Sequence, residues 1–423
     1  MIKNSTNWAG NYTYQAAQTH SPETVEQIQE LVLRSDKLKA LGTRHSFNNI
    51  ADSSGDLISL ERFEKILDVD REHLTVTVEA GVRYGHLARW LHEQGYALHN
   101  LASLPHISVA GAVATATHGS GDHHANLATA VSAMEIVTGN GEVIVLSEAK
   151  HHEQLEGAVV GLGGLGVVTR LTLNISPTFQ MQQDVYENLP LGTMEQHFDE
   201  LTSRAYSVSL FTDWRSGLFN QVWLKHHVPD GISIRADPEL FGARLATSHL
   251  HPIATLSAEN CTEQMGICGP WYERLPHFRL GFTPSSGEEL QSEYILPRRH
   301  AFAAFCAIDQ LRDYVVPLLQ ISEVRTIAAD NLWMSPCYKQ ACVAIHFTWK
   351  KDWDRVRRML PVLEEQLAPF EARPHWGKLF TISSARLQSL YERLPDFQAL
   401  LQQYDPHGKF RNAFLDQYIF GDL

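Results

Sequence analysis

The sequence contains little cysteine, and none of it is arranged to bind a metal. The five cysteines of this 423-residue chain all lie after residue 260, at positions 261, 268, 306, 337 and 342. An odd number in a chain of this length does not make a disulfide framework, and no C-x-x-C spacing points to zinc. We therefore expect reduced, mostly buried thiols, as is typical of a cytoplasmic protein, and no metal site.

Basic clusters and long apolar runs are also absent. Lysine and arginine total 35 against 48 aspartates and glutamates, which gives a formal net charge of −13. An acidic chain without a basic cluster lacks the charge that holds a phosphate backbone, so we expect no nucleic-acid partner. No stretch approaches the roughly 18 apolar residues of a membrane span, and the N-terminus lacks the apolar core of a signal peptide. We expect a cytoplasmic protein without a membrane partner.

The residues that are present predict an α+β fold with two domains. The length corresponds to two or three domains at about 100–200 residues each. Strands are expected at 57–60, 74–80 and 167–175, helices from Ser21-Pro22 and over 84–91, and a hairpin around the glycine turn at 139–141. Longer alternating runs follow residue 176, among them a strand at 342–349. The change of pattern predicts a domain boundary near residue 176.

Two glycine-rich stretches need separate interpretations. Residues 161–166 read GLGGLG and match G-x-G-x-x-G, but a helix-like segment precedes them and a β-branched strand follows. A dinucleotide fingerprint needs the opposite order, so we predict a tight helix-to-strand turn. Residues 102–121 are rich in small residues and contain no lysine or arginine. They suit either an anion held by main-chain N–H groups or a tightly packed domain seam.

Several motifs resemble one flavoprotein superfamily. GTRHSF (42–47) and SLPHISVAGAVATATHGSG (103–121) resemble the flavin-binding motifs of the vanillyl-alcohol oxidase, or p-cresol methylhydroxylase (PCMH)-type, superfamily. They look more closely like its alditol oxidase (xylitol oxidase) branch. The similarity continues along the chain in these segments: NWAGN (7–11), SLFTDWR (209–215), SEVRTIAAD (322–330), HFTW (346–349), ARPHWGK (372–378) and DPHGKFRNAF (405–414).

The resemblance implies a particular organisation and cofactor. We expect a PCMH-type FAD-binding domain at 10–176, an α+β substrate-binding (cap) domain at 177–380 and a C-terminal segment at 381–423 that returns to the FAD domain, in a monomer. FAD would be attached covalently through its 8α position to His45. Arg44 stands where the common form of this loop has glycine. The remaining FAD contacts that the resemblance implies are Leu41, Gly42, Thr43, Arg44, Ser46, Ser103, Ser108, Gly111, Thr115, Thr117, His118, Gly119, Val168 and Asn412.

The substrate residues also make sense from their chemistry. Glu323 and Arg325 lie two apart on an expected strand, so their side chains share one face. Such a pair is either a structural ion pair or a site for vicinal hydroxyls, because the acid accepts hydrogen bonds and the guanidinium donates them. The polyol pocket that we expect contains Ser103, Glu323, Arg325, His346, Thr348 and Lys378, with Glu323, Arg325 and Lys378 as catalytic residues.

The implied activity is the oxidation of the terminal C1 hydroxyl of an alditol to the aldose. A hydride would pass to flavin N5, and O2 would be reduced to hydrogen peroxide, so the partners are a small polyol and O2. Two alternatives stay open. One is an aldonolactone oxidase or dehydrogenase of the gulonolactone or arabinonolactone type, which shares a Glu-x-Arg pair and an HWGK-like segment. The other is a non-catalytic flavin- or sugar-binding protein.

Overall fold

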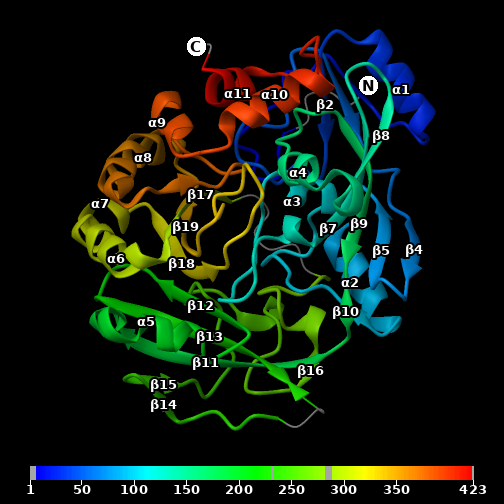
Figure 1. Cartoon of the computed structure of the whole chain (residues 1–423). Coiled ribbons are helices and arrows are strands. Elements are labelled where there is room, and N and C mark those ends of the chain that lie inside the picture. Colours follow the sequence, from blue (N-terminus) through cyan, green and yellow to red (C-terminus); the bar gives the residue numbers. More distant parts are fainter. Residues whose placement is uncertain (1–5, 230–232, 282–287, 422–423) are drawn as a thin grey trace.

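Two large antiparallel sheets form the frame of the protein (Figure 1). The computed structural model describes residues 6–229, 233–281 and 288–421. A five-stranded sheet is built from residues 66–174, and a ten-stranded sheet from residues 180–374. Helices accompany both sheets, which confirms the α+β prediction. The chain passes from one sheet to the other close to residue 176, and the three-part division at 10–176, 177–380 and 381–423 stays a proposal.

The five-stranded sheet contains several of the expected strands. Val76 and Val78 of the alternating segment are fully buried, and the predicted hairpin forms around Gly141. The strands, in their order across the sheet, are β4 (Ile66–Asp70), β5 (Thr75–Glu79), β9 (Val167–Asn174), β7 (Val131–Val137) and β8 (Val143–Ser147).

The glycine-rich turn at 161–166 joins a helix to a strand, as predicted. It links α4 (Glu148–Ala158) to β9. A Cβ atom on Gly166 would lie 2.3 Å from the carbonyl oxygen of Val137 in β7, and Gly166 has a φ of +146°. Glycine is required here by close packing between two strands, and the helix-before-strand order confirms that this is not a Rossmann turn.

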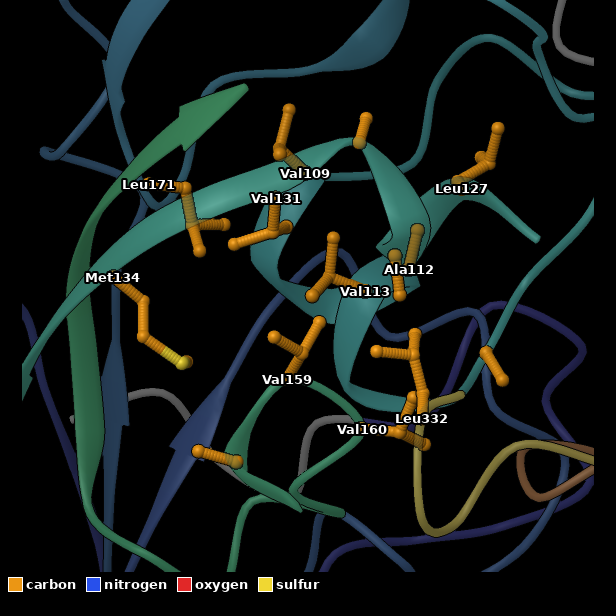
Figure 2. Close-up of a cluster of buried hydrophobic side chains, with 14 of the residues drawn as sticks. Val109, Ala112, Val113, Leu127, Val131, Met134, Val159, Val160, Leu171 and Leu332 are labelled. Atoms are coloured by element: carbon orange, nitrogen blue, oxygen red, sulfur yellow. The ribbon is translucent and has the colours of Figure 1, made fainter. Parts of the chain in front are cut away.

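An apolar cluster holds the helices against this sheet. α3 (Val109–Ala114) lies beside β7 and β9, and Figure 2 shows its side chains pointing toward theirs. Val109 and Val113 of α3 and Leu171 of β9 are at most 2% exposed. The small-residue stretch therefore includes a short helix whose apolar side is part of the core. Two further elements contribute to this part: α2 (Tyr84–Glu93), and the antiparallel pair of β6 (Tyr96–Ala97) and β10 (Ser176–Pro177).

A small parallel sheet precedes the five-stranded one. It has the order β1 (Gln18–His20), β3 (Asp56–Ser59) and β2 (Leu38–Leu41). The first helix, α1 (Val25–Arg34), starts later than predicted. Its N-cap is Thr24, whose side chain accepts a hydrogen bond from the Gln27 N–H, so the predicted start at Ser21-Pro22 is wrong. A second hydroxyl residue three positions on takes the capping role.

The ten-stranded sheet is apolar on one face and polar on the other. Helices cover the apolar face, where Val343, Ile345 and Phe347 of β19 are fully buried, as the alternation predicts. The covering helices are α5 (Met194–Thr202), α6 (Ala301–Gln310), α7 (Arg312–Val315) and α8 (Trp353–Leu367). The strands in order are β14 (Glu239–Leu240), β15 (Ala243–Leu245), β11 (Gln180–Pro190), β13 (Leu218–Val228), β12 (Ser207–Thr212), β18 (Leu319–Ile327), β19 (Cys342–Lys350), β17 (Glu289–Pro297) and β20 (Arg373–Pro374), with β16 (Gly269–Pro270) also paired to β11.

The C-terminal part of the chain packs on the first part (Figure 1). The Leu38 N–H donates to the carbonyl of Lys409 at 2.8 Å, and Lys39 Nζ donates to the carbonyl of Phe410 at 3.0 Å. The helices concerned are α9 (Ser384–Ser389), α10 (Leu394–Tyr404) and α11 (Ala413–Leu415), followed by a π-helical turn at Asp416–Phe420. Within the described ranges, no helix is both long enough and apolar enough to span a membrane.

Candidate active site

A cavity of about 480 Å³ lies where the first part of the chain meets the polar face of the ten-stranded sheet. Residues 39–51 and 102–118 contribute to its wall from the first part. Alternate residues of β17, β18 and β19 contribute from the second part. The cavity therefore joins the two regions that the sequence associates with a cofactor and with a substrate.

His45 lies in the wall of this cavity as a neutral imidazole. Burial, together with the nearby His106, lowers the pKa of His45 to about 4. Its ring stacks on Trp8 with centroids 5.4 Å apart, and its buried Nδ1 atom has no hydrogen-bond partner among the described residues. An unprotonated imidazole nitrogen without a hydrogen bond keeps its lone pair for a nucleophilic attack.

Next to His45, two glycines of the cavity wall pack closely against Ser108, which lies behind the wall. A Cβ atom on Gly42 would lie 2.7 Å from Ser108 Oγ, and one on Gly111 would lie 2.9 Å from the same atom. Ser108 Oγ is buried and has no partner among the residues described. The Ser108 N–H donates to Thr43 Oγ1 at 3.2 Å, which holds the two segments together. The cavity wall beside His45 is thus a cradle of small residues, among them Gly42, Thr43 and Gly111, next to an imidazole nitrogen without a partner, and this combination fits FAD.

Most of the residues predicted to contact FAD line the cavity, and four do not. Asn412 donates to three main-chain carbonyls at 49–52 and caps α11, so it ties the C-terminal segment to the His45 loop. Ser108 and Gly119 lie behind the wall, and Val168 lines a separate small cavity. Contact with FAD stays a prediction for all of the residues predicted to bind it. The residues that line the main cavity are Leu41, Gly42, Thr43, Arg44, His45, Ser46, Ser103, Gly111, Thr115, Thr117 and His118.

The predicted substrate residues come together through strand register. β18 and β17 flank β19, and the register pairs both Glu323 and Glu293 with His346. Three side chains from three strands therefore form a row across the polar face. Arg325 and Thr348 lie one alternate position along β18 and β19, and both line the same cavity. The prediction that the side chains of Glu323 and Arg325 share one face is confirmed, and the structure adds that His346 and Thr348 lie on the same face of the sheet.

Glu293 is the carboxylate at one end of this row. Its side chain is 1% exposed, with Oε1 2.8 Å from Arg325 Nη2 and Oε2 2.7 Å from Lys378 Nζ. Burial alone would raise the pKa of Glu293, but Lys378, His118 and Arg325 hold it well below its usual value. A permanently ionised Glu293 fixes both cations at the cavity wall.

Lys378 reaches the row from the segment after β20. Burial lowers the pKa of Lys378, and Glu293 opposes that shift. Lys378 Nζ also lies 2.7 Å from His346 Nδ1, while His346 Nε2 lies 3.1 Å from Thr348 Oγ1. Burial, with the charge of Lys378, lowers the pKa of His346 to about 4, so His346 is neutral and accepts from Lys378.

Glu323 sits at the other end of the row. Its Oε1 atom lies 2.7 Å from His277 Nε2 and 3.5 Å from Arg325 Nε. Burial would raise the pKa of Glu323, but Arg325 and His277 hold it far below its usual value. Ser103 Oγ lies 3.4 Å from Arg325 Nη1, so the small-residue stretch contacts the substrate side directly.

The sequence did not predict that Glu293, His277, Lys225 or Lys39 belongs to the site or its surroundings. Glu293 had a signal, because Glu289, Gln291 and Glu293 are polar at alternate positions before an apolar strand end. Lys225 and Lys39 are both at most 1% exposed, but a lysine in a strand is usually solvated and gives no hint of burial. His277 lies in a loop-rich region whose packing the local sequence does not specify.

The hydrogen-bonding groups of the site suit a polyhydroxylated molecule. The row offers ionised carboxylates that accept hydrogen bonds and cations that donate them. Two family comparisons agree with this chemistry: the family described as FAD binding domain matches residues 16–147, and D-arabinono-1,4-lactone oxidase matches residues 288–418. The fold, the cradle beside His45 and these matches define an FAD-dependent oxidoreductase.

Individual relatives narrow this class. An alditol oxidase of a Streptomyces species (strain IKD472) is 49% identical, with 98% of this chain and 99% of that protein covered. The L-gulonolactone oxidase of Bos taurus is 26% identical, with 98% of each covered. The crystal structure of cholesterol oxidase from B. sterolicum shares the fold, with a TM-score of 0.77 at 14% identity over 99% of this chain and 96% of that one. The chain belongs to the alditol oxidase family.

Proposed function

We propose that the protein oxidises the terminal C1 hydroxyl of an alditol to the aldose, with FAD as cofactor, O2 as electron acceptor and hydrogen peroxide as product. The observation that carries the proposal is the buried row of Glu323, His346 and Glu293, with Arg325 and Lys378 bound to Glu293, in the cavity that also contains His45. Bound FAD supplies the acceptor for the C1 hydride. Membership in the alditol oxidase family supports a polyol as substrate.

The residues of the row have distinct tasks in this proposal. Glu323 is ionised and accepts hydrogen bonds from polyol hydroxyls, while Arg325 donates to a neighbouring oxygen. Thr348 and Ser103 line the same cavity and contribute further hydroxyl contacts. Together these groups would orient the bound polyol with its C1 carbon toward the flavin.

Lys378 acts on the reacting oxygen. Its ammonium donates to Glu293 and to neutral His346, and its third proton is left for the C1 oxygen. The hydroxyl proton passes through Lys378 to the neutral His346 Nδ1, 2.7 Å from Lys378 Nζ, while Lys378 and Arg325 stabilise the negative charge that develops on the oxygen in a buried site, where such an interaction is strong. Glu293 balances the two cations, so both can remain charged without solvent.

Anaerobic reduction of the flavin tests this function. Xylitol or sorbitol should bleach the flavin absorbance of the wild-type protein, and readmitted air should restore it with release of hydrogen peroxide. Lys378→Met should slow the bleaching by about 10²- to 10³-fold, the usual loss for one donor to a developing oxyanion, while the FAD content stays the same. Lys150→Met, on the exposed surface of α4, is the control. Bleaching of Lys378→Met at the wild-type rate removes Lys378 from this role.

An aldonolactone substrate is the second candidate. The match of residues 288–418 to D-arabinono-1,4-lactone oxidase favours it, because this region contains the whole row of Glu323, His346 and Glu293 and also Arg325. Ring hydroxyls of a lactone present the same donors and acceptors as a polyol chain. A comparison of flavin reduction by xylitol and by L-gulono-1,4-lactone separates the two: faster reduction by the lactone replaces the alditol with the lactone.

A further inference from the structure

Behind Glu323 lies a lysine that no role in the reaction explains. Lys225 belongs to β13 and its side chain is fully buried. Its Nζ atom lies 2.6 Å from the carbonyl oxygen of Leu275, 3.0 Å from that of Pro276 and 3.1 Å from His277 Nδ1. An ammonium has three protons and no lone pair, so these three acceptors match its three donors.

This geometry determines which nitrogen of His277 carries the proton. Burial lowers the pKa of His277 to about 4, against the opposing effect of Glu323, so the ring is neutral. If Nδ1 accepts from Lys225, the single ring proton must be on Nε2. That atom lies 2.7 Å from Glu323 Oε1 and therefore donates to it. The three side chains form one directed chain of hydrogen bonds that ends at the cavity.

We propose that Lys225 and His277 are positioning residues for substrate recognition: Lys225 holds His277 in the Nε2–H tautomer, and His277 orients the carboxylate of Glu323 toward the substrate hydroxyls. The inference rests on the proposed role of Glu323 in polyol binding. Without His277, the nearest partner of Glu323 Oε1 among the described residues would be the cation Arg325, whose Nε atom lies 3.5 Å away. A buried carboxylate with so weak a contact would lose its fixed orientation.

The proposal predicts a pH dependence of substrate binding. Burial lowers the pKa of Lys225 to about 7, and Glu323 opposes this shift. Lys225 therefore keeps its third proton below about pH 7 and loses it above, so the tautomer of His277 is fixed at lower pH and released as the pH rises. The KM for a polyol should rise through this range. The groups that face Lys225 are Glu323 and Arg325 of β18, Cys261, Arg274, His277 and the ring of Trp223.

Steady-state kinetics of three variants test the effect on the substrate. Lys225→Met keeps the apolar stem and removes the donor, and His277→Phe fits the surrounding rings of Phe211 and Trp223 but cannot donate. Both should raise the KM for xylitol by about 10- to 100-fold, with a smaller change in kcat, and abolish the pH dependence of KM near pH 7. His277→Gln can donate to Glu323 and should restore KM to within about threefold of wild type. A wild-type KM in Lys225→Met and His277→Phe overturns the proposal.

The tautomer of His277 can be measured without any substrate. In the holoenzyme labelled with 15N-histidine, the resonances that disappear in His277→Gln belong to His277. At pH 6 they should report the Nε2–H form in the wild type, and a mixture of tautomers in Lys225→Met. An Nδ1–H form in the wild type rejects the inference even if xylitol is oxidised. Absence of polyol oxidation in the wild type, with the Nε2–H form present, rejects the proposed function instead. FAD content and melting temperature identify a variant that fails to fold. If Lys225→Met fails to fold, the comparison of KM between His277→Phe and His277→Gln tests the proposal.

Discussion

His45 shows how much a single residue depends on its surroundings. The main-chain N–H of Trp8 donates to the carbonyl of Arg44 at 2.8 Å, and the ring of Trp8 stacks on His45. On the far side, Asn48 Nδ2 donates to the carbonyls of Trp376 and Lys378, each at 2.8 Å. The loop that contains His45 is therefore tied directly to the segment that contains Lys378. A flavin on His45 and a cation at the substrate would keep a fixed relation to each other.

Arg44 has a backbone conformation that favours glycine. It has a φ of +64°, in the left-handed region that glycine adopts without strain. An L-residue in this region costs roughly 1–2 kcal/mol. Arg44 therefore holds a backbone conformation that glycine would adopt without this cost.

Covalent attachment of FAD is a prediction at the scale of one residue. We expect acid precipitation of the wild-type protein to leave the yellow colour in the pellet, because an 8α bond to His45 survives unfolding. His45→Ala should still bind FAD in the glycine cradle, but acid should release the flavin into the supernatant. His106→Gln, which changes the neighbouring imidazole, should leave the colour in the pellet. Free flavin in the wild-type supernatant would disprove the covalent bond.

At the scale of single elements, strict alternation was the most reliable guide. β5 and β19 were predicted from alternating apolar residues, and their apolar faces are buried as expected. The predicted start of α1 was wrong because Ser21 and Thr24 are both possible N-caps. Only the observed hydrogen bond from the Gln27 N–H to Thr24 distinguishes them. Helix termini depend on such local competition more than strands do.

The β7–β8 hairpin provides a prediction for one element. Gly141 has a φ of +76°, and a Cβ atom there would lie 2.9 Å from Leu33 Cγ. Gly141→Ala should lower the free energy of unfolding by about 1–2 kcal/mol because of backbone strain. Gly192→Ala is the matched control, since it is exposed with no atom within 4 Å of the new Cβ, and should change stability by less than about 1 kcal/mol. Thermal unfolding followed by circular dichroism measures both, and equal effects would show that Gly141 is not strained.

At the scale of the whole molecule, one arginine connects the two regions that form the cavity. Arg298 lies 2.6 Å from Asp122 Oδ1, and its Nε atom donates to Asp199 of α5 at 2.7 Å. It also donates to Thr202 Oγ1 at 2.6 Å. Asp122 directly follows the small-residue stretch of the cofactor side, whereas Asp199 belongs to a helix that covers the ten-stranded sheet.

This connection should stabilise the protein in a pH-dependent manner. Burial would raise the pKa of Asp122, but hydrogen bonds from Arg298 and Thr326 and the charge of Arg298 hold it below its usual value. The stabilisation is thus complete above the unfolded pKa of about 3.9 and is lost as the pH falls below it. Arg298→Met should cost about 1–2 kcal/mol at pH 7, a figure reduced for solvent screening, and the difference from wild type should shrink toward pH 3.

The control for this prediction is an exposed ion pair. Arg215 lies 3.5 Å from Asp213 on the surface, and Arg215→Met should change the melting temperature little at any pH. If Arg298→Met is as harmless as Arg215→Met at pH 7, Arg298 does not hold the two regions together.

The sequence by itself determined the class of fold, and it predicted a cofactor loop and substrate residues that the structure brings to one cavity. These follow from local signals: alternation along strands, the wrong context of the G-x-G-x-x-G turn, and motifs that resemble a flavoprotein family. Only the tertiary structure revealed Glu293 at one end of the row, and Lys225 with His277 behind Glu323 at the other. Their roles come from the register of β17, β18 and β19 and from burial of charges contributed by distant segments. Such pairings depend on contacts between strands far apart in the chain, which no local pattern encodes.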